Sequence, residues 1–367
     1  MTTESANLYL KEEEKLLYSL RGLYKRYGYR PYRMSKFEKY ELYAGNKDFL
    51  VSDRVITFTD TNGELLALKP DVTLSIVKNA SFREGRKQKL YYQENVYRPT
   101  GSSRQFHEIM QCGLECIGDL DSYDLFEVMQ LAEMSLRTVS ADSVLSFSHL
   151  GILRSLLLLL PGDERSQSEL LHLLATRNEH ELSALFAGRG WRSELLDDIK
   201  SLLSLSCGIS QLPAKLLQLQ LAWLSPAVFD ELSELSLLAE AAESDARFDF
   251  SVINDIHYYN GIIFQGFIRG ISEKVLSGGR YDRLLERMNR KGAAAGFAVY
   301  FGILEQLFPV RAVLDADVLL LYDRETPLTE VQSAVKRLQA EGKSVSAQRC
   351  AEGSYRETVD IRRSPNA

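Results

Sequence analysis

Cysteine is scarce in this 367-residue chain, and its placement does not indicate a metal site. The four cysteines are Cys112, Cys116, Cys207 and Cys350. Only the first two are close together, and their C-x-x-x-C spacing lacks the second cysteine or histidine pair of a zinc site. We therefore expect reduced thiols in a cytosolic protein, with no metal and no other cofactor.

Long apolar runs and an excess of basic charge are also missing. The longest leucine run, Leu156 to Leu160, is too short to span a bilayer and stops at Pro161-Gly162. Residues 1–20 contain no apolar segment of the signal-peptide type. The net charge is −6, so no global basic field indicates nucleic-acid binding. These absences favour a cytoplasmic protein that has no contact with a membrane.

The chain does contain enough apolar residues, 45% of the total, for a large core in two or three domains. The clearest local signal is a hairpin over 55–68, because Thr61-Asn62-Gly63 is a favoured tight turn between two strands. The spacing of apolar residues predicts the other elements of this part. They are helices over 12–27, 71–80 and 123–139, and strands over 89–97, 108–117 and 143–150.

The composition changes after Gly151. Residues 152–245 are rich in Leu, Ala, Ser and Glu at helical spacing, which predicts a helical insertion. A β-type alternation is predicted from 248 to 268, and a helix is predicted near Tyr281. A small β-α-β unit follows, with strands over 318–322 and 345–349 and a helix from Pro327 that Thr326 is expected to cap. The pattern indicates an α+β fold, divided into 1–151, 152–245, 246–309 and 310–367.

Five short segments carry a recognisable order of motifs. They are Phe58-Thr59-Asp60 with Leu68-Lys69-Pro70-Asp71-Val72-Thr73, Asn95-Val96-Tyr97-Arg98 with Gln111-Cys112-Gly113-Leu114-Glu115, His257-Tyr258-Tyr259, Gly278-Gly279-Arg280-Tyr281-Asp282, and Ala295-Gly296-Phe297-Ala298-Val299. In this order they resemble the motifs of histidyl-tRNA synthetases. One segment alone is weak evidence, whereas five in order are strong. The resemblance implies a class II synthetase-like core built on an antiparallel sheet.

The resemblance also implies a histidine-binding site. The ammonium group of a bound histidine needs hydrogen-bond acceptors such as Asp71 and Gln111. The carboxylate of this histidine suits the guanidinium fork of Arg98. Its imidazole suits Glu115 together with a tyrosine hydroxyl. The complete set of candidate residues is Asp71, Thr73, Arg98, Gln111, Glu115, Tyr258, Tyr259 and Tyr281, with Tyr259 or Tyr281 supplying the hydroxyl.

Each candidate taken alone also has a purely structural interpretation. Asp71 can be a helix N-cap. Gln111 and Glu115 share one face of a strand and can lie on a solvated face. The tyrosines can be ordinary core or surface residues. Arg280 can cap a strand end, and His257 is expected to be structural rather than a ligand.

Positions that the resembled family uses for amino-acid activation are altered here. The family has arginine where this chain has Asn254, and its motif 3 arginine falls at Ile303 or Gln306. Of three arginines at the phosphate site, only Arg98 is kept, and the adenine-binding glutamate of motif 2 becomes Thr100. Activation depends on positive charge around the α-phosphate. We therefore expect no catalytic residues and no aminoacylation.

A chain that keeps the histidine pocket without these arginines resembles the regulatory subunit of ATP phosphoribosyltransferase, the first enzyme of histidine biosynthesis. This resemblance implies a homodimeric core in a hetero-oligomer, commonly an octamer, with a short-form catalytic subunit that needs it for activity and feedback by histidine. Residues 312–367 carry 8 Lys and Arg against 9 Asp and Glu, so no tRNA-binding surface is evident. Two alternatives stay open: a divergent histidyl-tRNA synthetase, and a histidine-sensing regulator of another partner.

Overall fold

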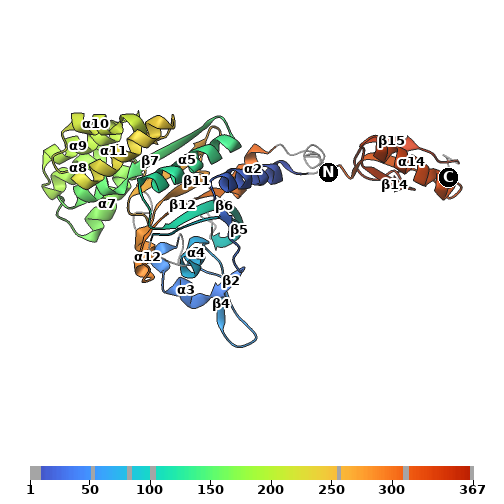
Figure 1. Cartoon of the computed structure of the whole chain (residues 1–367), viewed down its shortest axis with the longest axis horizontal. Helices are drawn as coiled ribbons and strands as arrows, with labels where there is room; N and C mark the ends of the chain where they lie inside the picture. Colours follow the sequence, from blue (N-terminus) through green and yellow to red (C-terminus); the bar gives the residue numbers. More distant parts are fainter. Residues whose placement is uncertain are drawn as a thin grey trace. The chain divides into compact units, whose positions relative to one another are not determined.

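The computed structural model describes residues 10–50, 54–80, 85–99, 105–253, 258–308 and 314–363 (Figure 1). The chain divides into two compact units, one up to Phe308 and one from Pro309. A nine-stranded sheet and a small three-stranded sheet belong to the first unit, and a separate three-stranded sheet belongs to the second. Within the described ranges, no helix combines the length and the apolar character needed to cross a bilayer.

The nine-stranded sheet is antiparallel through its centre. Its order is β1-β5-β6-β12-β11-β10-β7-β9-β8. The bounds are β1 (Arg30–Pro31), β5 (Lys87–Pro99), β6 (Phe106–Gly118), β7 (Ser143–His149), β8 (Cys207–Gly208), β9 (Arg247–Phe248), β10 (Ile262–Ile268), β11 (Leu276–Arg280) and β12 (Ala293–Tyr300). Because β12 pairs with β6, motif segments from before and after the insertion lie side by side in one sheet.

Helix α5 (Ser122–Val139) packs on one face of this sheet, and α2 (Glu12–Arg26) packs against α5. Asp121 caps α5 by accepting a hydrogen bond from the Asp124 backbone N–H at 3.0 Å. The close approach of α5 requires glycine at 266, because a Cβ there would lie 2.6 Å from the Leu136 side chain. Apolar packing therefore fills this face, and the opposite face of β6, β11 and β12 carries the polar side chains described below.

The predicted hairpin is confirmed. Strands β3 (Thr57–Thr59) and β4 (Leu65–Leu68) pair antiparallel, and Gly63 has a φ of 81°, which favours glycine. The Asp60 carboxylate closes the turn by accepting from the Asn62 and Glu64 backbone N–H groups. Also in this region are β2 (Phe37–Lys39), α3 (Tyr40–Ala44), the 3-10 helix η1 (Lys47–Phe49) and α4 (Thr73–Asn79). The chain thus passes from β4 directly to α4, whose N-terminus faces the large sheet.

The residues predicted as a helical insertion form helices that lie together beyond β7 (Figure 1). Their bounds are α6 (Leu150–Leu157), α7 (Glu164–Ala175), α8 (Glu179–Arg189), α9 (Ser193–Ser204), the 3-10 helix η2 (Ile209–Gln211), α10 (Leu212–Leu219) and α11 (Pro226–Ala241). They share one large apolar core with the sheet. We call α6 to α11 the helical insertion below.

The continuous alternation predicted from 248 to 268 is wrong in its first half, because β9 ends at Phe248 and β10 begins only at Ile262. Phe250 and Ile253 are buried without forming a strand, so their apolar character reflects burial alone. The tyrosine pair therefore precedes the strand. After β11 come α12 (Asp282–Arg287), α13 (Phe301–Leu304) and the 3-10 helix η3 (Glu305–Leu307), with β12 between α12 and α13.

The second unit is a parallel sheet of order β14-β13-β15 with one helix. Its elements are β13 (Ala316–Leu321), α14 (Leu328–Ala340), β14 (Val345–Gln348) and β15 (Tyr355–Asp360). The sequence did not predict β15, because this strand is mostly exposed and lacks an apolar pattern. The predicted cap is also wrong: Pro327 occupies the N-cap position, and the Thr326 hydroxyl donates to Asp323 instead.

Candidate functional site

A polar cavity of about 230 Å³ lies on the face of the large sheet opposite α5. All eight predicted site residues line it, although they come from five separate segments of the chain. The other lining residues are Phe49, Leu50, Tyr92, Ser277, Gly296, Phe297, Ala298 and Tyr300. Pockets for drug-sized ligands are larger, about 300–1,000 Å³. This cavity therefore suits a small metabolite of amino-acid size.

Glu115 is the buried carboxyl group of this cavity. It lies on β6 and is 2% exposed. The Thr73 hydroxyl donates to its Oε1 at 2.8 Å, and the Tyr281 hydroxyl donates to its Oε2 at 2.6 Å. Burial nevertheless raises the pKa of Glu115 to about 8, because these two hydrogen bonds only partly offset the loss of hydration. Glu115 therefore holds a proton at neutral pH, and an N–H donor or a cation bound beside it would favour its ionised form.

The strand opposite Glu115 must carry glycine. Gly296 on β12 pairs with Glu115 across the sheet. A Cβ at this position would lie 1.7 Å from Glu115 Oε2 and 2.5 Å from the Leu114 carbonyl oxygen. Real Cβ atoms do not approach other atoms this closely, so the Ala295-Gly296-Phe297 segment makes room for the carboxylate.

The raised pKa of Glu115 predicts a particular pH dependence of stability. The usual glutamate pKa is 4.5 and the folded value is about 8, so between these values the folded state holds a proton that the unfolded state releases. The free energy of unfolding should therefore fall by up to about 1.4 kcal/mol per pH unit in this window and level off above it. The Glu115→Gln variant should lack this slope. Urea unfolding of both proteins at about pH 5, 6.5 and 8 measures these free energies. The same pH dependence of the free energy of unfolding in both proteins would contradict the prediction.

Asp71 lies just before α4 and lines the cavity, but it is not the N-cap suggested by the sequence, because Val72 occupies that position. Its Oδ1 accepts from the Leu74 backbone N–H at 2.9 Å, close to the N-terminus of α4. Its side chain also lines the cavity. Burial raises the pKa of Asp71, while the hydrogen bond from Leu74 and the positive charge of Arg98 act in the opposite direction. Asp71 therefore combines a hydrogen bond to the first turn of α4 with a place in the cavity wall.

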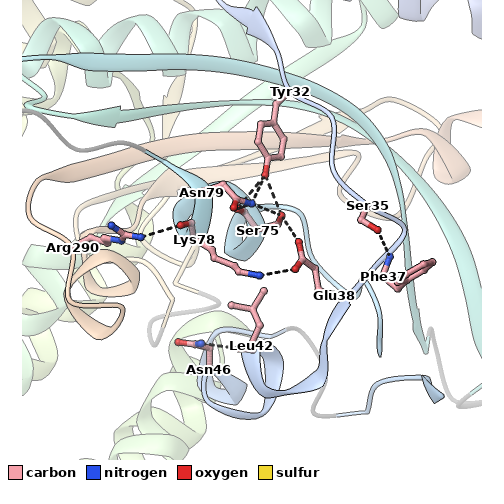
Figure 2. Close-up of polar contacts among 10 residues, drawn as sticks. All are labelled: Tyr32, Ser35, Phe37, Glu38, Leu42, Asn46, Ser75, Lys78, Asn79 and Arg290. Carbon is pink, nitrogen blue, oxygen red and sulfur yellow. Dashed lines mark hydrogen bonds and ion pairs between the residues drawn. The ribbon is translucent and has the colours of Figure 1, made fainter. Parts of the chain in front are cut away.

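Helix α4 is held from behind by a polar network (Figure 2). The Tyr32 hydroxyl lies 3.1 Å from the Ser75 hydroxyl, which donates to Glu38 Oε1 at 3.2 Å. Lys78 donates to the other oxygen of Glu38 at 2.7 Å. This network anchors α4 to β2 and the segment before it, and so helps to fix the two site residues near the start of the helix.

Aromatic rings form one wall of the cavity. The ring of Tyr258 lies 4.7 Å from that of Tyr259, 5.6 Å from that of Tyr281 and 6.1 Å from that of Phe49, measured between centroids. The Arg98 guanidinium, also in the cavity lining, lies 5.9 Å from the centroid of the Tyr300 ring. The sequence did not identify Phe49 or Tyr300 as site residues, because neither carries a polar motif of its own.

The candidate phosphate-site positions supply no further positive charge within the described residues. Ile303 packs against the apolar core, and Gln306 is exposed. Neither lines the cavity, where Arg98 is the one cationic side chain among the described residues. Asn254, His257 and Thr100, the other positions singled out from the sequence, lie outside the described residues.

Arg280 lies outside this cavity, although it belongs to the same motif as Tyr281. Its Nε donates to Asp282 Oδ2 at 2.7 Å. The Asp282 backbone N–H in turn donates to the Asn260 side chain at 2.6 Å. The sequence suggested a strand-end cap for Arg280, and the structure places it instead in a polar cluster that faces the helical insertion.

An antiparallel sheet that carries a small polar cavity on one face, with these motif residues on its central strands and on α4, defines a class II synthetase-like protein. The sequence profile of the family described as Histidyl-tRNA synthetase matches residues 8–304. The chain therefore belongs to that family. The match covers almost the whole first unit and excludes the C-terminal one.

Similar curated proteins carry two different names. The ATP phosphoribosyltransferase regulatory subunit of Oceanobacillus iheyensis is 28% identical over 277 residues, which cover 74% of this chain and 68% of that protein. The histidine–tRNA ligase of Methanococcus vannielii is 25% identical over 305 residues, covering 80% and 71%. Because the two identities are similar, they do not by themselves distinguish these functions, and the distinction depends on particular residues of the site.

Solved structures share the fold. An ATP phosphoribosyltransferase regulatory subunit/histidyl-tRNA synthetase from Bacillus halodurans superposes with a TM-score of 0.74 at 22% identity, covering 95% of this chain and 94% of that one. A chain of the ATP phosphoribosyl transferase (HisG:HisZ) complex from Thermotoga maritima superposes with a TM-score of 0.60 at 19% identity, covering 78% and 96%. The class II synthetase-like architecture therefore extends over most of the chain.

Proposed function

We propose that this protein is a non-catalytic regulatory subunit of ATP phosphoribosyltransferase and that it binds histidine in the cavity around Glu115. The observation that carries the proposal is a contrast within one site. The carboxyl group suited to an imidazole is buried and accepts one hydrogen bond at each oxygen, which leaves capacity for a ligand N–H, whereas Arg98 is the one cation among the described lining residues. Such a site suits recognition of an amino acid rather than its activation by ATP.

The ligand atoms can be matched to the cavity by charge. An ammonium group finds acceptors in Asp71 and Gln111, and a carboxylate finds the guanidinium of Arg98. The imidazole N–H finds Glu115, held by Thr73 and Tyr281. Tyr258 and Tyr259 supply aromatic surface beside the ring. An amino acid without a ring N–H would leave Glu115 buried and unmatched, so discrimination should be steep.

The proposed partner is a short-form catalytic subunit in the cytoplasm. Several similar proteins are named regulatory subunits, and one structural neighbour comes from a complex with the transferase. We propose a homodimer of the synthetase-like core within a hetero-octamer, without tRNA. The balanced charge of residues 312–367 is consistent with the absence of tRNA binding.

Co-expression with a short-form ATP phosphoribosyltransferase tests this function. The two chains should co-purify, transferase activity should depend on this protein, and histidine should inhibit the complex while leucine does not. Calorimetry on the free protein and on the complex should show histidine binding. A catalytic subunit that is equally active without this chain would exclude the proposed role.

The main alternative is a divergent histidyl-tRNA synthetase, which the Methanococcus vannielii relative favours. The same preparation separates the two functions, because a synthetase would exchange pyrophosphate into ATP in the presence of histidine. A histidine-sensing regulator of some other partner would bind histidine without affecting the transferase.

A further inference from the structure

The helical insertion contacts a cavity residue near its start and a polar cluster outside the cavity near its end. At its start, Arg154 on α6 donates to the backbone carbonyls of Asn260 at 3.1 Å and Tyr259 at 3.3 Å. The Leu150 backbone N–H donates to the Gly261 carbonyl at 2.9 Å. The segment that carries the cavity residue Tyr259 is thus bonded directly to the first helix of the insertion.

At the other end of the insertion, Glu231 on α11 faces two groups of the sheet. Its Oε1 lies 3.6 Å from Arg280 Nη1 and 3.5 Å from His149 Nε2. The Nδ1 of His149 accepts from the Gly151 backbone N–H at 3.0 Å, so the proton lies on Nε2, which is near Glu231 Oε1 without a hydrogen bond between them. Burial alone would raise the pKa of Glu231, but His149 and Arg280 outweigh it and the pKa is lowered. Glu231 is therefore an ionised carboxylate that interacts with the sheet through long ion pairs rather than hydrogen bonds.

A series of polar interactions leads from Glu231 to residues next to two of the cavity tyrosines, Tyr281 and Tyr259. Arg280 also binds Asp282, and Asp282 Oδ2 accepts from the Asn260 side chain at 3.0 Å. Asp282 Oδ1 accepts from the Ala294 backbone N–H at 2.9 Å. Tyr281 lies between Arg280 and Asp282 in the sequence, and Tyr259 directly precedes Asn260, so this series of interactions constrains the backbone beside each tyrosine.

We propose that Glu231 is a positioning residue through which the helical insertion sets the affinity of the cavity for its amino-acid ligand. This inference rests on the proposed function for the identity of the ligand, histidine. The charge of Glu231 attracts Arg280 across 3.6 Å and so favours its contact with Asp282, and Asp282 is bonded to the backbone or side chains beside Tyr281 and Tyr259. A shift of α11 would loosen both tyrosines, and ordered tyrosines would in turn favour one position of α11.

The test compares Glu231→Gln with a matched control, Asp230→Asn. Both remove one negative charge from α11, but Asp230 is exposed. The Glu231→Gln variant should bind histidine about three- to tenfold more weakly, the range typical of residues that act through coupled networks. Hydrogen exchange should also accelerate in segments 258–263 and 276–284, without added ligand. The control should change neither quantity, and thermal unfolding verifies that both variants are folded.

A second variant separates positioning from general destabilisation. The Arg280→Gln variant already removes the link that Arg280 makes between Glu231 and Asp282. In that background, adding Glu231→Gln should weaken histidine binding no further. Fully additive effects, or a Glu231→Gln variant that matches its control in affinity and exchange, would overturn the inference. If the unaltered protein binds no histidine, the proposed function fails, and the exchange rates alone then decide whether Glu231 positions the cavity. If Glu231→Gln does not fold, Arg280→Lys replaces it in both measurements.

Discussion

Replacement of Glu115 by alanine should weaken histidine binding by about 100-fold. A hydrogen bond to a charged group contributes about 1.5–3 kcal/mol, and the truncation also leaves buried donors unmatched. Here those donors are the hydroxyls of Thr73 and Tyr281, which lose their acceptor. In the assembled complex with the catalytic subunit, the variant should still activate the transferase, but histidine should no longer inhibit it. Calorimetry and transferase assays with and without histidine measure both effects.

A matched control for this variant lies on the same strand. Glu108 on β6 is exposed and does not line the cavity, so Glu108→Ala should leave histidine binding and inhibition unchanged. A Glu115→Ala complex that stays fully sensitive to histidine would place the allosteric site elsewhere, for example at a subunit interface. A variant that fails to assemble would show that the cavity has a structural role.

If histidine inhibits a distant active site, the coupling must be reciprocal. The phosphoribosyl diphosphate substrate should weaken histidine binding by the same factor by which histidine weakens substrate binding, typically a free energy of about 1–3 kcal/mol. Calorimetric titrations of the complex in both orders provide this comparison. The Glu115→Ala complex should lose both halves of the coupling together.

The second large effect concerns aminoacylation. Histidine-dependent ATP–pyrophosphate exchange should be lower than in a working synthetase by at least about 100-fold, because the loss of even one transition-state donor costs about 10²–10³ in rate. The sequence has Asn254 and either Ile303 or Gln306 in place of two arginines of the resembled family. Of these positions, Ile303 packs against the core and Gln306 is exposed, so neither supplies charge to the cavity.

Exchange assays with a histidyl-tRNA synthetase as reference measure this loss, and charging of tRNA should be absent as well. Exchange at a hundredth of the reference rate or above would contradict the prediction. Restoring arginine at 254 together with 303 or 306 is a stricter comparison. If exchange then appears, the missing arginines account for the loss, and if it does not, the segment around Thr100 is also altered.

The sequence alone predicted most of the local elements and the eight polar and aromatic residues proposed for the site, but not Phe49 or Tyr300. The Asn62-Gly63 turn and the alternation around it predicted the hairpin, since such turns depend on a few adjacent residues. The motif order selected eight side chains that all line one cavity. It did not predict the exposed strand β15, and it extended the strand before Ile262 too far, because apolar spacing reports burial as well as extended conformation.

Only the tertiary structure decided the chemical state and the surroundings of those residues. In the sequence, Glu115 is recognisable only as a polar residue on one face of a strand. Its pKa is raised only because β12 and α4 exclude water from it in the folded protein. The same is true of Arg280, which approaches Glu231 only because folding brings the side chain of an α11 residue near the ends of β11 and β7. Hydrogen bonding within a turn is local in the chain, whereas dehydration and ion pairing depend on segments that are distant in sequence and become neighbours only on folding.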